Sequence, residues 1–252
     1  MPDRYICEVI NNERMSDVIF AITIACEGLA ASARAGQFLH VKCGRERILR
    51  RPFGICDVRG SELSFVFEVK GGGTRWLSAC EPGRTLDVLG PLGNGFSIPD
   101  GKVIVVGGGL GSPPMLLAAK SAAGGATAIL GFREECRVIL VKKFSEVCDE
   151  VFLMTDDGSA GQRGVVTEPL ERLLRLGGFA AVIACGQLVM QKAVADMCEK
   201  YNMPCQVSLE ERMACGVGAC LVCACETVSG GVTQMSRVCK DGPVFYAENV
   251  VW

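Results

Sequence analysis

Residues 103–111 read Val-Ile-Val-Val-Gly-Gly-Gly-Leu-Gly, an apolar run that passes directly into a glycine-rich turn. A stretch rich in Ala and Leu follows from about residue 113 to residue 123 and predicts a helix. Further apolar runs then alternate with helical stretches, the runs at 127–132, 150–155 and 180–185 and the helices at 167–176 and 188–200. Buried apolar strands that alternate with helices predict an α/β domain with a parallel sheet.

The sequence on either side of this domain has a different character. Residues 1–97 contain short β-rich runs between Gly, Pro and charged residues, at 18–24, 37–41, 63–69 and 85–89, which predict an antiparallel barrel or sandwich. Beyond Pro204 there is little periodicity and a group of closely spaced cysteines, typical of a small module organised by a bound group. We therefore predict a multi-domain α+β protein divided into residues 1–97, 98–205 and 206–252.

Composition narrows the functional class. The 252 residues are 49% hydrophobic and 21% charged, which excludes a disordered chain, and they include 15 cysteines. The first five residues lack the pattern of a secretory signal, and the longest apolar runs, around 103–106 and 138–141, have the length of strands rather than membrane spans. We expect a cytoplasmic protein whose reduced thiols serve metal or redox chemistry. A net charge of −2 indicates neither nucleic-acid nor membrane binding.

The spacing of four cysteines is the most specific signal. Cys215, Cys220 and Cys223 are separated by four and then two residues, and Cys239 follows at a distance, as in plant-type [2Fe–2S] ligand sets. The glycines at 216 and 218 allow tight turns that point backbone N–H groups at sulfur. Structural zinc stays open as an alternative, although a zinc ribbon normally has a second C-x-x-C pair. Cys225 is expected to face the other way in an extended segment.

Two other segments suit phosphate groups. The glycines at 107, 108, 109 and 111, after an apolar strand and before a helix, loosely match the dinucleotide fingerprint, with a purely structural turn as the alternative. The segment Arg-Arg-Pro-Phe-Gly-Ile at 50–55 and the turn Gly-Gly-Gly-Thr at 71–74 suit a pyrophosphate and a flat ring, against an ordinary basic strand and turn.

Most of the other cysteines and the single histidine are expected to have no chemical role. Cys185, at the end of a predicted parallel strand, is the exception, because ligands collect at that edge of such a sheet. The ten remaining cysteines and His40, the single histidine, are expected to pack rather than react. Asp156 and Asp157 are predicted to belong to a capping loop.

Together these segments resemble one known family. The chain is similar to the electron-transfer subunits of class 1B, NAD-dependent dihydroorotate dehydrogenases, in the ferredoxin-reductase-like flavoprotein superfamily. The matching stretches are Gly-Gln-Phe at 36–38, Arg-Pro-Phe at 51–53, Gly-Thr at 73–74, Leu-Asp-Val-Leu-Gly-Pro-Leu-Gly-Asn-Gly-Phe at 86–96, the segment 107–114, Thr-Asp-Asp-Gly-Ser at 155–159, Ala-Cys-Gly at 184–186 and Ser-Leu-Glu-Glu-Arg-Met-Ala-Cys at 208–215. They extend over essentially the whole chain.

The resemblance implies three bound groups. It implies an FAD-binding β-barrel, a nicotinamide-binding α/β domain and a C-terminal [2Fe–2S] module. FAD would contact Arg51, Pro52, Phe53, Gly54, Val66, Phe67, Glu68, Gly73 and Thr74. NAD(H) would bind as an exchangeable cosubstrate near Gly107, Gly108, Gly109, Gly111 and Cys185, and iron would be held by Cys215, Cys220, Cys223 and Cys239.

The implied function is an electron relay within a larger oxidoreductase. Flavin exchanges electrons singly or in pairs, so it belongs between nicotinamide and an iron–sulfur cluster. The resemblance implies a heterotetramer of two plus two with an FMN-containing catalytic subunit that oxidises dihydroorotate to orotate in pyrimidine biosynthesis; no catalytic residue for that step is assigned here. The alternatives are an NAD(P)H-dependent subunit serving ferredoxin, hydrogenase or another flavoenzyme, and a zinc-stabilised non-enzymatic module.

Two positions depart from the family pattern. Gly54 stands where the family usually has a serine whose hydroxyl can reach the flavin, so we expect different tuning of the flavin. Gln187 stands where the family usually has a proline, so we expect a different turn beneath the nicotinamide.

Overall fold

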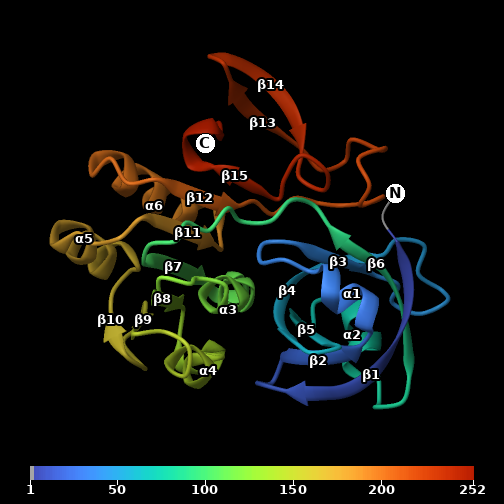
Figure 1. The fold of residues 1–252 in the computed structure, drawn as a ribbon. Coiled ribbons are helices and arrows are strands. Elements are labelled where there is room, and N and C mark those ends of the chain that lie inside the picture. Colours follow the sequence, from blue (N-terminus) through green and yellow to red (C-terminus); the bar gives the residue numbers. More distant parts are fainter. Residues whose placement is uncertain (1–2) are drawn as a thin grey trace.

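The computed structural model describes residues 3–252, so Met1 and Pro2 of the stretch that lacks a secretory pattern lie outside the described residues. A barrel and a sheet domain stand side by side, with α3 between them and a C-terminal hairpin beyond both (Figure 1). The order of elements confirms the predicted architecture of an antiparallel barrel, an α/β parallel-sheet domain and a small C-terminal segment.

Six strands close the N-terminal barrel in the order β1-β2-β5-β4-β3-β6. They are β1 (Arg4–Arg14), β2 (Ile19–Ala25), β3 (Phe38–Val41), β4 (Arg51–Arg59), β5 (Glu62–Glu68) and β6 (Thr85–Leu92), with short helices α1 (Glu27–Ser32) and α2 (Gly72–Ser78) in the connections. All neighbouring strands are antiparallel. Alternate residues fill the barrel, such as Leu39 and Val41, while Phe38 belongs to the core of the adjoining sheet domain.

The second domain is a seven-stranded sheet in the order β10-β9-β8-β7-β11-β12-β15. Its strands are β7 (Val103–Gly108), β8 (Ala126–Phe132), β9 (Glu150–Thr155), β10 (Gln162–Arg163), β11 (Ala181–Cys185), β12 (Cys205–Ser208) and β15 (Val244–Tyr246). Its helices are α3 (Ser112–Lys120), α4 (Val141–Ser145), α5 (Thr167–Leu176) and α6 (Leu188–Lys200), with 3₁₀ turns η1 (Gly109–Gly111), η2 (Glu135–Arg137) and η3 (Ala247–Asn249). Every pairing is parallel except that of β12 with β15.

One apolar run does not form the strand that its length suggests. Residues 138–141 turn at Leu140, which has a φ of 64°, and α4 begins at Val141. Ile139 and Leu140 are buried without joining the sheet. Apolar content alone does not distinguish a strand from a buried turn of this length.

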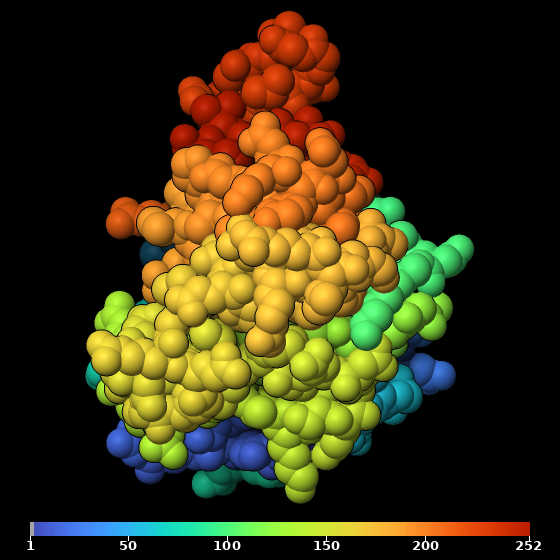
Figure 2. Space-filling view, turned by 90° about the vertical axis from the view of Figure 1, so that its left-hand side faces the viewer, coloured from blue at the N-terminus to red at the C-terminus, as the bar shows by residue number. Residues whose placement is uncertain are grey.

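The C-terminal segment leaves the sheet and returns to it. After β12 comes the cysteine loop, then the hairpin of β13 (Ala224–Ser229) and β14 (Val232–Arg237), which projects at the top of the molecule (Figure 2). Strand β15 then pairs with β12 at the sheet edge. The predicted division between residues 205 and 206 stays a prediction, and β12 spans it. The helices within residues 3–252 are all too short or too polar to cross a membrane.

An ion pair between α3 and β4 joins the sheet domain to the barrel. Lys120, at the end of α3, places its Nζ 2.6 and 2.8 Å from the carboxylate oxygens of Asp57 in β4. Asp57 is only 5% exposed, and its other cationic partner is Arg59, 3.0 Å away. A buried carboxylate that loses its main partner is costly, whereas an exposed pair contributes little.

We expect Lys120→Met to lower the free energy of unfolding by about 2 kcal/mol, because it leaves Asp57 buried beside Arg59 alone. The matched control is Lys192→Met, which removes the exposed pair with Asp196 and should cost no more than about 0.5 kcal/mol. Urea unfolding of the two variants measures both values. Equal losses in the two variants would show that the Asp57 pair does not stabilise the domain junction.

Candidate functional site

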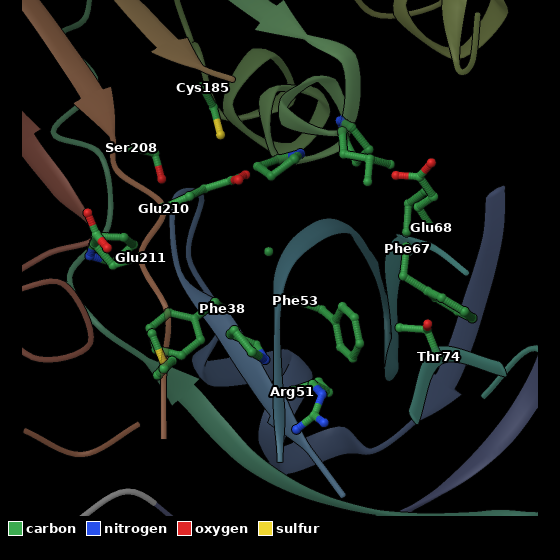
Figure 3. A pocket seen from close by; sticks show the side chains of 18 of the residues that line it. Phe38, Arg51, Phe53, Phe67, Glu68, Thr74, Cys185, Ser208, Glu210 and Glu211 are labelled. Carbon is green, nitrogen blue, oxygen red and sulfur yellow. The ribbon is translucent and has the colours of Figure 1, made fainter. Parts of the chain in front are cut away.

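A cavity of about 530 Å³ lies where the barrel, the sheet domain and the C-terminal segment meet (Figure 3). We call it the junction cavity. The barrel lines it with Gly36, Phe38, Arg51–Gly54, Val66–Glu68 and Lys70–Thr74, the sheet domain with Leu110, Pro113, Pro114 and Cys185, and the C-terminal segment with Ser208–Glu211, Met213, Val238 and Pro243. Ten of the predicted binding residues line this one space: Arg51, Pro52, Phe53, Gly54, Val66, Phe67, Glu68, Gly73, Thr74 and Cys185.

The barrel wall offers a flat apolar surface with a cation at one end. Phe53 reaches into the cavity, while its ring stacks on Phe65 and tilts against Phe67, with centroids 5.0 and 5.7 Å apart (Figure 3). Arg51 is held by the segment just before β4, since its Nη1 donates to the carbonyls of Leu49 and Arg50. The rest of the guanidinium can bind an anion, as bidentate recognition of phosphate requires.

The turn into α2 completes the barrel wall. Gly73 lies so close to Arg51 that a Cβ there would be 3.6 Å from its Nε and 3.3 Å from Cys43 Cβ. Thr74 Oγ1 accepts hydrogen bonds from the backbone N–H groups of Lys70 and Gly71, at 2.9 and 3.2 Å. These bonds hold the turn open toward the cavity.

Glu68 stands at the rim of the cavity as an ion-paired carboxylate. Burial raises its pKa, but hydrogen bonds from Arg137 and Lys70 outweigh burial, and the pKa lies below its ordinary value. Arg137 belongs to η2 of the sheet domain, so this pair also joins the two domains across the cavity rim.

Gly54 has a structural reason to lack a side chain. A Cβ at this position would lie 2.6 Å from Cγ of Pro114, in the first turn of α3. The glycine therefore lets α3 approach β4 at the cavity wall, where a serine would need the helix to move. Gly54, where the family usually has serine, therefore goes together with the close packing of α3 against β4.

The glycine motif lies behind the cavity instead of lining it. A Cβ on Gly107 would be 2.6 Å from Ser112 Cα, and one on Gly111 would be 2.2 Å from the Cys185 carbonyl oxygen. Gly108 approaches Met190 and Gly186 in the same way, and Gly109 has a φ of 53°. Close packing of α3 on β7 and β11 thus accounts for this motif. Contact between Gly107, Gly108, Gly109 or Gly111 and a nicotinamide nucleotide stays a prediction.

The sheet domain presents Cys185 and the following turn to the cavity. The Cys185 thiol points into the space from the end of β11 (Figure 3). Complete burial raises its pKa far above the ordinary value, so it stays a neutral thiol. Gln187 has a φ of −63°, the angle that a proline ring imposes, so the turn keeps the backbone shape that proline would give. At its φ angle, Gln187 therefore does not show the difference that we expected in this turn.

Glu210 is a cavity residue to which sequence reasoning assigned no role. Its side chain extends from the end of β12 toward the middle of the cavity (Figure 3). The carboxyl is accessible through the open cavity but lies among many protein atoms, and this burial raises its pKa. The feature of the sequence that could have identified Glu210 is its place just after a parallel strand, since ligands collect at the carboxyl ends of such strands. The cavity is also lined by Ser208, Glu211 and Met213, at or after the end of the same strand, and sequence reasoning likewise assigned them no role.

The structure gathers the four predicted metal ligands, which we call the cysteine quartet: Cys215, Cys220, Cys223 and Cys239. Cys215 lies beside Cys220, and Cys223 lies beside Cys239, whose backbone N–H donates to Cys223 Sγ at 3.4 Å, so the quartet consists of two pairs. Within residues 3–252, no three Cys, His, Asp or Glu side chains are grouped so that they could hold one metal ion. Two pairs of thiols suit the two irons of a [2Fe–2S] cluster, which is held by four cysteines.

Backbone N–H groups surround the quartet, as expected from its glycines. Val217 and Ala219 donate to Cys215 Sγ at 3.4 and 3.3 Å, and Gly218 donates to Cys239 Sγ at 3.1 Å. Burial opposes ionisation of Cys215, but these bonds and the Cys220 thiol lower its pKa to about 6. Burial raises the pKa of Cys239 to about 12. The loop therefore already favours thiolate at one of its ligand positions.

The other cysteines are free thiols, and no disulfide forms among the 15. Most are buried in the cores, as expected, while Cys136 is exposed in η2. Cys225 lies in β13 opposite Ser236 and lines a second cavity of about 420 Å³. Asp157 accepts hydrogen bonds from the backbone N–H and hydroxyl of Ser159, which confirms the predicted loop.

Gly54→Ser should lower the free energy of unfolding by about 1–3 kcal/mol, because the new side chain overlaps Pro114. Gly71→Ser is the matched control, since a Cβ on Gly71 meets nothing within 4 Å. In the double variant Gly54→Ser/Pro114→Ala the added destabilisation should shrink. Urea unfolding of the series tests this, and a loss that is independent of residue 114 would contradict the packing explanation.

Comparison with known proteins gives the family. Residues 210–251 match the model for the iron–sulfur cluster binding domain of dihydroorotate dehydrogenase B. The chain is 40% identical to the dihydroorotate dehydrogenase B (NAD+) electron transfer subunit of Caldanaerobacter subterraneus subsp. tengcongensis, covering 97% of both chains. It is 38% identical to the corresponding subunit of Clostridium perfringens, covering 94% of both.

A solved structure is similar over the same length. It is an NADH-dependent reduced ferredoxin–NADP oxidoreductase studied for flavin-based electron bifurcation, with a TM-score of 0.85, 32% sequence identity, and coverage of 100% of this chain and 92% of that one. Near-complete coverage and 40% identity to curated relatives place the chain in the family of dihydroorotate dehydrogenase B (NAD+) electron transfer subunits.

Proposed function

We propose that the chain is the electron transfer subunit of an NAD-dependent dihydroorotate dehydrogenase and relays electrons between NAD(H) and a catalytic partner. The observation that carries this proposal is that the junction cavity and the cysteine quartet share a wall. Met213 and Val238 line the cavity, and they lie two residues before Cys215 and one before Cys239. A redox group in the cavity and a cluster in the quartet would therefore be neighbours.

The residues of the junction cavity suit FAD. Its barrel wall carries a cation, Arg51, beside the flat surface of Pro52 and Phe53, which matches a ligand with a pyrophosphate and a planar ring. We assign Arg51, Pro52, Phe53, Gly54, Val66, Phe67, Glu68, Gly73 and Thr74 to FAD. Bound FAD supplies the conversion between paired and single electrons.

Nicotinamide is assigned to the opposite wall. The carboxyl ends of β7, β11 and β12 meet there, and the neutral Cys185 thiol points into the cavity. NAD(H) would enter the cavity between Cys185 and the barrel wall, where its nicotinamide would face the flat ring bound on that wall. Gly107 and Gly111 support this wall by letting α3 pack close to β7 and β11, Gly108 lets Met190 of α6 approach, and Gly109 supplies a positive φ in the turn.

The cysteine quartet is assigned to a [2Fe–2S] cluster. Cys215 with Cys220 and Cys223 with Cys239 would each hold one iron. Cys220 is exposed, and so are the apolar side chains of Leu221 and Val222, at 63% and 51%. The cluster would therefore lie beneath a surface on which a partner subunit can dock.

The partner in this proposal is an FMN-containing catalytic subunit that oxidises dihydroorotate, in a heterotetramer of two plus two. The two relatives support it, since both are electron transfer subunits of dihydroorotate dehydrogenase B. A cytoplasmic location belongs to the proposal, because 15 unpaired thiols suit a reducing compartment.

A second candidate function follows from the solved structure that covers the whole chain. That protein is a ferredoxin–NADP oxidoreductase, and its 32% identity makes a ferredoxin-linked relay the alternative. Gly54 and Gln187, which depart from the pattern of dihydroorotate dehydrogenase subunits, are the positions that leave room for it.

Anaerobic co-expression with the catalytic subunit of the same organism separates the two functions. The purified complex should contain FAD, iron and acid-labile sulfide, and it should reduce NAD+ when dihydroorotate is added. A complex with intact cofactors that fails this assay, but accepts electrons from reduced ferredoxin, would favour the second candidate. A protein without flavin or iron would contradict both.

Cys223→Ser should remove the iron and acid-labile sulfide and abolish dihydroorotate-dependent NAD+ reduction, while FAD stays bound. Cys225→Ser, two residues along the chain, is the control and should keep the cluster, because Cys225 lies in β13. Iron and flavin content and the visible spectrum measure the outcome. A cluster retained in Cys223→Ser and lost in Cys225→Ser would reverse the ligand assignment.

A further inference from the structure

His40 lies between the junction cavity and the cysteine quartet. It is the single histidine of the chain, in β3, and only 1% of it is exposed. Its strand partners are Pro52 of β4, a residue of the cavity wall, and Leu89 of β6. Because Leu39 and Val41 point into the barrel core, alternation places the His40 side chain on the outer face of the barrel.

The imidazole is buried without a well-formed hydrogen bond. Neither Nδ1 nor Nε2 makes one within residues 3–252, and a weak contact with the Arg50 backbone only partly offsets the effect of burial on the pKa of the ring. Burial, assisted by the charge of Arg50, lowers the pKa of His40 to about 4, so the ring is neutral near pH 7 and has one N–H to donate. A buried polar group without a well-formed hydrogen bond is costly, which indicates a missing partner.

The ring faces the loop that contains the quartet. A Cβ built on Gly216, the residue after Cys215, would lie 2.5 Å from His40 Nδ1 and 3.1 Å from Cε1 and Cγ. No side chain could therefore stand between the imidazole and this turn, and the φ of 72° at Gly216 also favours glycine. The edge of the ring with Nδ1 packs directly against the backbone beside a predicted iron ligand.

The hydrogen bonds already made to the quartet sulfurs all come from backbone N–H groups of the C-terminal segment. The donors to Cys215 are backbone N–H groups on its C-terminal side, from Val217 and Ala219. Those to Cys239 and Cys223 also come from the backbone of the C-terminal segment. His40 is a barrel side chain that packs against the loop at Gly216.

We propose that His40 donates a hydrogen bond to sulfur of the [2Fe–2S] cluster on its Cys215 side, and thereby raises the reduction potential of the cluster. This inference rests on the proposed function, in that the quartet must hold a cluster. Hydrogen bonds to sulfur stabilise the reduced, more negative cluster. The bond would connect the flavin barrel with the cluster module.

A single histidine makes a direct test possible. The holoprotein, prepared with a tag that lacks histidine in cells fed ¹⁵N-histidine, carries ¹⁵N in one side chain. Pulsed electron paramagnetic resonance of the reduced cluster should then show a ¹⁵N coupling that unlabelled protein lacks. A cluster that is present and reduced, but has no ¹⁵N coupling, would overturn the inference without affecting the proposed function.

Variants test the effect on potential. His40→Leu should shift the reduction potential of the cluster to a more negative value, and His40→Gln, which keeps a donor, should restore part of the difference. The FAD potential is the internal control and should not shift with the cluster. A leucine variant with an intact cluster and an unchanged potential would refute the tuning role.

The two measurements separate the possible failures. If His40→Leu does not fold, the ¹⁵N measurement on the wild-type protein still decides the hydrogen bond. If wild-type protein that retains FAD has neither iron nor a cluster spectrum, the proposed function fails together with this inference.

Discussion

The pairing of β15 with β12 is the constraint on which the site depends. Three residue pairs, Gln206 with Tyr246, Val207 with Phe245 and Ser208 with Val244, bring both ends of the segment 209–243 to one sheet edge. Asn94, just after the barrel, reinforces this closure. Its side chain donates to the Val244 carbonyl at 2.8 Å and accepts from the Val244 N–H at 3.0 Å. The cysteine quartet is thereby held next to the barrel.

Close packing between the domains gives the junction cavity its shape. Gly54 admits Pro114, Gly93 admits Pro243, and Gly216 admits His40, in each case where a Cβ would approach within 2.6 Å of its neighbour. Small residues at these contacts let three separate segments form continuous walls. The ion pairs of Asp57 with Lys120 and of Glu68 with Arg137 secure the same boundary between barrel and sheet.

This arrangement explains how one chain can transfer electrons both in pairs and one at a time. The walls proposed for nicotinamide and for the flat ring and the loop proposed for the cluster belong to three different parts of the fold. Each part contributes one face to a shared space, so bound groups would be neighbours. The exposed apolar residues beside Cys220 leave the outer side of the quartet available to a partner.

Local sequence determined the chemistry of this protein, and tertiary structure decided its arrangement. The spacing of Cys215, Cys220 and Cys223 predicted the gathered quartet, and the strand-like runs predicted the barrel and the parallel sheet, because spacing and periodicity are properties of short segments. The role of Gly54, the position of Glu210 and the burial of His40 against Gly216 depend on residues far apart in the chain. Packing alone brings such residues together, so only the folded chain could show them.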